Sequence, residues 1–150
     1  MQHPKKEETE IQSLEEIASR LLDAFNRHDS GALAALYAPD QITTSTGEPE
    51  PVRGREAKEE FVAGFFRAFP DMRLEPFSIL YTGDHIVFEV DARGTNTGPL
   101  ETPEGEAPPT GRGIDVKMNF IVRVDENGLI AEDRTCYDTG LFMQQLGFLD

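Results

Sequence analysis

One alternating stretch of this sequence carries two carboxylates suited to acid/base chemistry. In residues 85–94 (HIVFEVDARG), Glu89 and Asp91 stand two positions apart and share one face of an extended strand. If that face is solvated, Glu89 or Asp91 pairs with an arginine across the sheet, which is the arrangement we favour. If it points inward, their proximity raises the pKa of one carboxyl, and a general base results. On that second alternative, Asp91 is our first candidate for the catalytic base and Glu89 for a substrate contact.

A second stretch, residues 129–138 (LIAEDRTCYD), places an acid, a hydroxyl and a phenol in one alternating set. If Thr135 faces inward, then Asp133 and Tyr137 face inward as well. The hydroxyl of Tyr137 can donate a hydrogen bond to a carbonyl oxygen, so Tyr137 is our second catalytic candidate. The alternative is a core aromatic whose hydroxyl is satisfied within the protein. The other set contains Cys136, which we interpret as a small core residue.

Asp138 ends this stretch and precedes an apolar segment, residues 139–147 (TGLFMQQLG). The acid either works in a pocket or caps a helical turn by accepting hydrogen bonds from the next backbone N–H groups. We favour the cap, because no base or nucleophile stands nearby in the sequence. Leu141, Phe142 and Leu146 would then hold the C-terminal segment against the core.

Composition limits the partners and the compartment. A length of 150 residues fits one domain, and 38% hydrophobic against 28% charged residues indicates a soluble globular protein. The formal net charge of -14 disfavours nucleic acids and anionic membranes, because phosphates repel such a surface. A single cysteine allows no internal disulfide, and the opening residues contain no apolar signal segment, so we expect a cytoplasmic protein. The three histidines have no metal-ligand spacing, and we expect no metal.

The N-terminal half predicts three helices that must carry the apolar wall of any site. Residues 1–8 read as a flexible tail, and residues 9–150 as a single domain. Apolar residues recur every three or four positions from residue 11 to residue 25, which predicts a helix ending near His28. Asp29 is the expected N-cap of a short second helix through residue 38, followed by a short strand. A third helix is predicted over residues 55–68, with Phe61 and Phe65 one turn apart.

The C-terminal half predicts four strands, separated by hairpin turns and by one long acidic loop over residues 99–113, which we expect to be mobile. Helices followed by paired strands indicate an α+β fold. A curved antiparallel or mixed sheet wrapped around the helices would form a cone-shaped α+β barrel. The open end of such a cone is a natural pocket for a small molecule.

Five segments in this order carry a family resemblance: LLDAFNRHDSGALAALYAPD, RGREAKEEFVAGFFRAFPDMRLE, GTNTG, PPTGR and YDTGLFMQQLG. From about Ser19 to Gly147 the sequence resembles the SnoaL-like polyketide cyclase (ester cyclase) family of the nuclear-transport-factor-two-like superfamily. The resemblance implies a cone-shaped barrel of cystatin-like type, often as a homodimer, and an apolar pocket without metal or organic cofactor. It also implies an intramolecular aldol reaction that uses a strand aspartate and a neighbouring histidine.

The catalytic positions of that family carry other residues here. The aspartate falls at Thr135, the helper histidine at Phe120, and a further histidine of many relatives at Asn96. A threonine cannot perform carboxylate proton chemistry near neutral pH.

The catalytic residues of two other enzymes in the superfamily are not matched here either. The first aspartate of limonene epoxide hydrolase resembles Asp91, but its arginine falls at Glu89 and its second aspartate at Thr135. The acid and the tyrosine of ketosteroid isomerase fall at Ser45 and Leu21.

The leading hypothesis is therefore a SnoaL-like enzyme that acts on a small apolar carbonyl compound by cofactor-free cyclisation, isomerisation or hydration. A non-catalytic binding module and a dimerisation domain with a filled interior are the alternatives. In the first two cases, the expected substrate contacts are Phe25, Tyr37, Phe65, Glu89, Phe120, Asp133 and Thr135.

Overall fold

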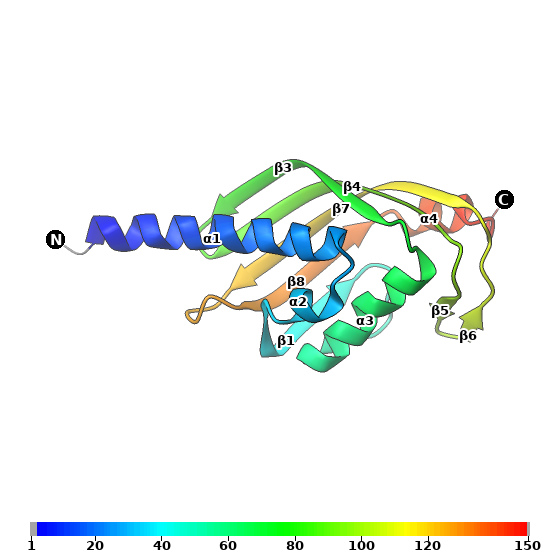
Figure 1. The fold of residues 1–150 in the computed structure, drawn as a ribbon, viewed down its shortest axis with the longest axis horizontal. Coiled ribbons are helices and arrows are strands. Elements are labelled where there is room, and N and C mark those ends of the chain that lie inside the picture. Colours follow the sequence, from blue (N-terminus) through cyan, green and yellow to red (C-terminus); the bar gives the residue numbers. More distant parts are fainter. Residues whose placement is uncertain (1–2, 150) are drawn as a thin grey trace.

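A curved six-stranded sheet and the three helices on its concave face make up the body of the protein (Figure 1). The computed structural model describes residues 3–149, with side chains from Leu14 onward. The strand order is β2-β1-β8-β7-β4-β3. In chain order the elements are α1 (His3–Asn26), α2 (Ser30–Ala34), β1 (Tyr37–Ser45), β2 (Val52–Arg53), α3 (Arg55–Ala68), β3 (Arg73–Thr82), β4 (His85–Thr95), β5 (Leu100–Thr102), β6 (Gly105–Ala107), β7 (Gly113–Val124), β8 (Ile130–Tyr137) and α4 (Thr139–Gln145).

The helices follow their apolar stripes. Ile17 and Leu21 of α1 are buried against the sheet, and α3 has the predicted bounds. Asp29 caps α2 as predicted, because its Oδ1 accepts a hydrogen bond of 2.9 Å from the backbone of Ala32. The helix α1 also includes residues 3–8, which the sequence assigned to a flexible tail. Lysine and glutamate in that stretch are good helix formers, so the helix continues outward without an apolar stripe.

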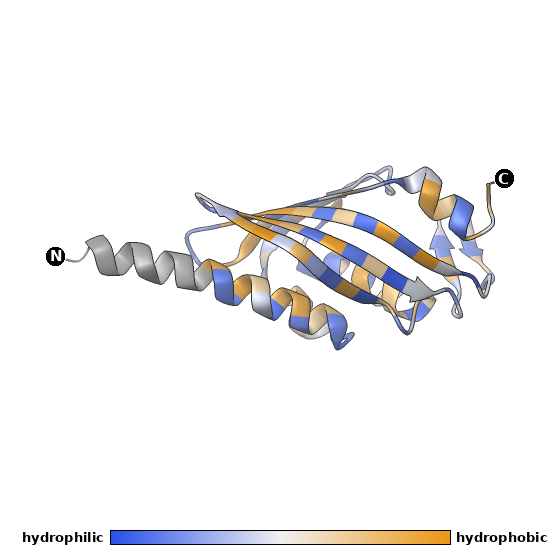
Figure 2. Ribbon diagram, turned by 90° about the horizontal axis from the view of Figure 1, so that it is seen from above, coloured by the Kyte–Doolittle hydropathy of each residue, from blue (hydrophilic) through white to orange (hydrophobic). Residues whose placement is uncertain are grey.

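Hydrophobic and hydrophilic residues alternate along the long strands (Figure 2). In β4 and β7 the apolar set is buried on the inner face, and the mostly polar set lies on the outer face. On β4, Ile86, Phe88, Val90 and Ala92 are fully buried on the inner face. Most pairs in the sheet are antiparallel, but β1 and β8 run parallel. The sheet is therefore mixed, and the predicted α+β class with a curved sheet around helices is confirmed.

Two segments differ from the sequence prediction. Tyr37 is the first residue of β1 rather than the end of the second helix, which stops at Ala34. The acidic loop contains a short hairpin of β5 and β6, whose turn is closed by Gly105 at φ 113°, a backbone angle that favours glycine. A three-residue strand pair is too short for a periodic pattern to reveal it.

The C-terminal segment is held as predicted, with two corrections. Asp138 caps α4, since its Oδ1 accepts a 2.9 Å hydrogen bond from the backbone of Leu141. Phe142 and Leu146 are buried, but Leu141 is 38% exposed and does not contribute to the anchor. Cys136 is also exposed, because it belongs to the outward set of β8.

Across residues 3–149, no helix combines the length and the hydropathy needed to cross a membrane. The predicted cytoplasmic location stays a prediction.

Candidate active site

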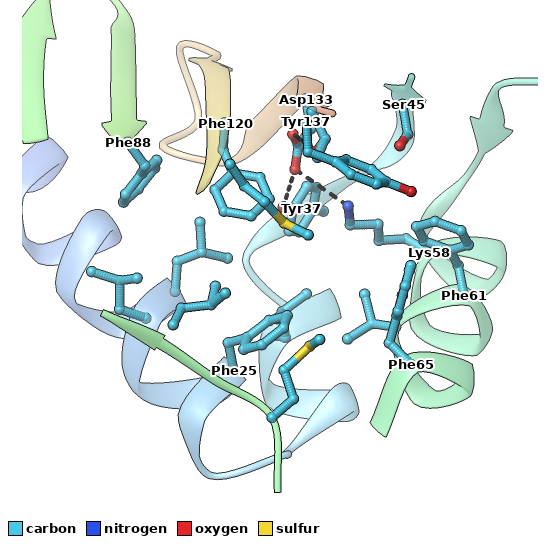
Figure 3. A pocket seen from close by; sticks show the side chains of 18 residues that line it. Phe25, Tyr37, Ser45, Lys58, Phe61, Phe65, Phe88, Phe120, Asp133 and Tyr137 are labelled. Atoms are coloured by element: carbon cyan, nitrogen blue, oxygen red, sulfur yellow. Dashed lines mark hydrogen bonds and ion pairs between the residues drawn. The ribbon is translucent and has the colours of Figure 1, made fainter. Parts of the chain in front are cut away.

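A mostly apolar cavity lies between the helices and the inner face of the sheet (Figure 3). Its volume, measured for the centre of a water molecule, is about 80 Å³. One water needs about 10–15 Å³ on that measure, so the cavity has room for a guest of roughly six heavy atoms. Its wall includes five phenylalanines: Phe25 from α1, Phe61 and Phe65 from α3, and Phe88 and Phe120 from the sheet.

The polar centre of the cavity is the carboxylate of Asp133, whose side chain is only 3% exposed. Its Oδ2 accepts a 2.6 Å hydrogen bond from the hydroxyl of Tyr37 and lies 3.3 Å from Nζ of Lys58. Its Oδ1 accepts a 3.2 Å hydrogen bond from the hydroxyl of Thr135. A buried carboxylate that is paired with a cation and two hydroxyl donors therefore lines an otherwise apolar cavity.

Three elements bring these groups together. Alternation along β8 points Asp133 and Thr135 inward. The parallel neighbour β1 begins at Tyr37, where an irregularity in the β1–β8 register precedes Ile42. Lys58 stands four residues before Val62 on the buried stripe of α3, so its side chain reaches the sheet beneath the helix.

Burial sets the protonation of Tyr37. Its pKa is raised well above 10.0, first by desolvation and then by the negative charge of Asp133 and their hydrogen bond. The phenol therefore stays protonated near neutral pH and acts as a donor. The ammonium of Lys58 also lies 4.7 Å from the centre of the Tyr37 ring, a cation–π distance.

Tyr137 supplies a second phenol at another part of the wall. Among the described side chains, its hydroxyl has no hydrogen-bond partner, and it packs against Gly47, where a Cβ atom would overlap it. The pKa of Tyr137 is raised by burial and then by the negative charge of Glu48. A phenol that stays protonated and makes no hydrogen bond to the described residues is available to donate to a guest.

Seven of the nine residues predicted from the sequence line this cavity: Phe25, Tyr37, Phe65, Phe120, Asp133, Thr135 and Tyr137. Asp91 and Glu89 do not. Both belong to the outward set of β4, which is the solvated alternative that the sequence favoured. Asp91 accepts a 2.8 Å hydrogen bond from Lys117, which is the first cause of its lowered pKa. The geometry therefore gives no support to Asp91 as a base or to Glu89 as a substrate contact.

Lys58 was missed by the sequence reading, although a signal existed. It lies on the apolar stripe that continues through Phe61, Val62 and Phe65, yet it is charged. A lysine on the buried face of a helix needs a partner of opposite charge. Only the fold reveals that this partner is Asp133, which is 75 residues away in sequence.

Asn96, which stands where many relatives carry a histidine, has a structural role. Its fully buried amide donates 3.0 Å and 2.9 Å hydrogen bonds to the carbonyls of Ala68 and Gly98. Its Oδ1 accepts hydrogen bonds from the backbone and the hydroxyl of Thr110. The residue ties the end of α3 to two loops and does not line the cavity.

His28 and His85, the two histidines whose side chains are described, serve the scaffold. His28 stacks on Phe66, and its Nε2 lies 2.7 Å from the carbonyl oxygen of Met72. His85 pairs with Asp84 at the β3–β4 turn. In the described part of the chain, no three of the residues His, Cys, Asp and Glu gather in a way that could hold a metal ion.

Comparison with solved structures supports the fold. A candidate SnoaL-like polyketide cyclase from Jannaschia sp. CCS1 is 22% identical and superposes with a TM-score of 0.79, covering 90% of this chain and 92% of its own. A protein with a ketosteroid isomerase-like fold from Catenulispora acidiphila is 21% identical at a TM-score of 0.73, covering 90% of this chain and 94% of its own.

The family follows from two further comparisons. IdmH, a candidate polyketide cyclase from Streptomyces antibioticus, is 31% identical at a TM-score of 0.70, covering 89% of this chain and 97% of its own. No curated protein matches the sequence. The model of the SnoaL-like domain matches residues 18–133, which is most of the chain. The protein therefore belongs to the SnoaL-like domain family.

Proposed function

We propose that the protein binds a small, largely apolar carbonyl compound in its cavity and removes or relocates a proton next to the carbonyl group. The observation that supports this most strongly is the carboxylate of Asp133, buried among aromatic side chains and within reach of a guest. Water is largely excluded there, and electrostatic interactions with a developing negative charge are stronger than in solution. No cofactor enters this proposal.

Asp133 is the base in this proposal, in place of Asp91. Oδ1 carries one donor, Thr135, whereas Oδ2 carries both Tyr37 and Lys58. The less occupied Oδ1 is thus the oxygen that accepts a proton from the guest. The relation to the family is direct: the aspartate expected at Thr135 is missing, but a carboxylate two residues earlier faces the same cavity.

Two donors stabilise the enolate oxygen that forms when the proton leaves. Lys58 has three N–H groups and, among the described residues, one hydrogen-bond acceptor. Tyr137 also lines the cavity, and its hydroxyl makes no hydrogen bond to the described residues. A carbonyl oxygen between them would receive a charged and a neutral hydrogen bond, in the manner of an oxyanion hole.

A non-catalytic binding module is the second candidate. The three donors around Asp133 favour it, because a carboxylate that is already hydrogen-bonded must release or share a partner before it takes a proton. In that case the cavity would hold its guest without converting it.

Exchange of α-protons separates the two candidates without knowledge of the natural substrate. Cyclopentanone, which has six heavy atoms, is dissolved in deuterated buffer with the protein, and loss of the α-proton signals is followed by NMR. We expect exchange above the buffer rate, reduced about 100-fold by Asp133→Asn. The matched control is Asp91→Asn, which removes a carboxylate from the outer face of the sheet. This variant should catalyse exchange as the wild type does. Binding of the ketone without exchange would select the binding module.

A further inference from the structure

Lys58 is the one basic side chain on the cavity wall, within the part of the chain whose side chains are described. It is 5% exposed, whereas Lys117 on the outer sheet face is 73% exposed at its side chain. The sequence has two other lysines, Lys5 and Lys6, whose side chains lie outside the described residues. A lysine desolvated in an apolar pocket beside a proton acceptor is the arrangement that activates an amine as a nucleophile.

A purely structural role as the counter-ion of Asp133 accounts for only part of this geometry. A structural counter-ion is best served by arginine, whose fork of donors can hold both oxygens of a carboxylate. Lys58 instead makes one hydrogen bond, of 3.3 Å, to one oxygen. The rest of its ammonium faces the ring of Tyr37 and the cavity. Nζ of Lys58 can therefore approach the carbonyl carbon of a guest in the cavity.

We propose that Lys58 is a covalent catalyst, whose amine forms an imine with the carbonyl carbon of the guest. This rests on the proposed function, since it requires a carbonyl compound in the cavity. The substrate class narrows accordingly to aldehydes and unhindered ketones, because esters and amides do not form stable imines. The protonated imine withdraws electrons from the neighbouring carbon more strongly than a hydrogen-bonded carbonyl, and it eases removal of the α-proton by Asp133.

The reaction balances with the groups present. The ammonium of Lys58 first passes one proton to Oδ2 of Asp133, 3.3 Å away, and becomes a neutral amine. Its electron pair forms a C–N bond to the carbonyl carbon, and the carbonyl oxygen takes the proton back from Asp133. The C–O bond then breaks, and the oxygen leaves as water with a second proton from the nitrogen. One ammonium and one ketone thus yield one protonated imine and one water, with no change in oxidation state.

Reductive trapping tests this directly. The full-length protein is incubated with cyclopentanone and sodium cyanoborohydride, which reduces a protonated imine to a stable secondary amine. Intact mass spectrometry and peptide mapping then locate the added cyclopentyl group. We expect one group per chain, on Lys58, formed at least tenfold faster than on Lys117. Lys58→Arg, which keeps the positive charge but cannot form an imine, should lose this labelling, and Lys117→Arg should keep it.

Two further measurements on the same samples distinguish failure of the imine proposal from failure of the proposed function. Cyclopentanol, which has no carbonyl group, reports occupancy of the cavity by a thermal shift, and α-proton exchange of cyclopentanone reports the acid/base step. Exchange without labelling of Lys58 overturns the covalent role and leaves the proposed function standing. Labelling spread equally over the lysines overturns it as well. If cyclopentanol does not bind, α-protons do not exchange and Lys58 is not labelled, both the proposed function and the imine are contradicted.

Discussion

The buried pair of Lys58 and Asp133 makes a quantitative prediction about stability. Replacing Lys58 by Met keeps an unbranched apolar stem in the cavity wall but leaves the carboxylate of Asp133 without its cation. Removing one partner of a buried ion pair costs about 3–5 kcal/mol, because an uncompensated charge stays buried. The free energy of unfolding of an ordinary domain is about 5–15 kcal/mol, so Lys58→Met should lower the urea midpoint severely.

The double variant Lys58→Met/Asp133→Asn removes both charges, while the amide oxygen introduced at position 133 can still accept the hydrogen bond of Tyr37. We therefore expect it to be more stable than the sum of the two single variants implies, by at least about 1 kcal/mol. Urea unfolding followed by circular dichroism measures all three variants and the wild type. The matched control is the exposed pair of Lys117 and Asp91, for which a much smaller coupling is expected. Additive single effects, each below about 1 kcal/mol, would refute the buried pair.

Other side chains give sharper, single-site tests. Tyr37→Phe removes a hydrogen bond to a charged acceptor and should cost about 1.5–3 kcal/mol. Because the folded-state pKa of Tyr37 is raised, its contribution is fully present below pH 10.0 and is lost as the pH rises through the folded value. The stability gap between wild type and Tyr37→Phe, measured by urea unfolding, should therefore close under alkaline conditions, and a gap that does not depend on pH would contradict this. Asn96→Ala should cost about 2–4 kcal/mol in the same assay without altering the exchange of bound cyclopentanone, since it breaks a buried network away from the cavity. Tyr137→Phe should change stability by less than about 0.5 kcal/mol, because the hydroxyl has no described partner, yet slow the exchange. The homodimer implied by the family is checked by sedimentation velocity, in which Ile121→Glu on the outer sheet face should yield monomers; a wild-type monomer would contradict it.

Local patterns predicted the parts of this fold that depend on neighbours in sequence. The bounds of α3 and the caps at Asp29 and Asp138 follow from periodicity and capping rules. Residues far apart in sequence could not be paired in this way. The parallel contact of β1 with β8, which brings Tyr37 to Asp133, depends on a long connection that no local pattern encodes.

The facing of β4 explains why two predicted site residues do not line the cavity. Alternation in β4 left two faces for Glu89 and Asp91, and the choice between them depends on which side the helices cover. Both faces of β4 looked plausible, because the apolar set could serve as either lining or core. In β8 the inward set included a buried acid, Asp133, that the sequence ranked only as a substrate contact. Its partner Lys58 lies on another element, α3, so the sequence alone could not show the importance of Asp133.

A crystal structure of the protein with cyclopentanol tests the central claim most directly, since the alcohol occupies the cavity without reacting. We predict the ring between Phe25, Phe65 and Phe120, with its oxygen within hydrogen-bond distance of Asp133 or Lys58. Cyclopentanol found only on the surface at saturating concentration, with the cavity closed over by its own side chains, would contradict the account.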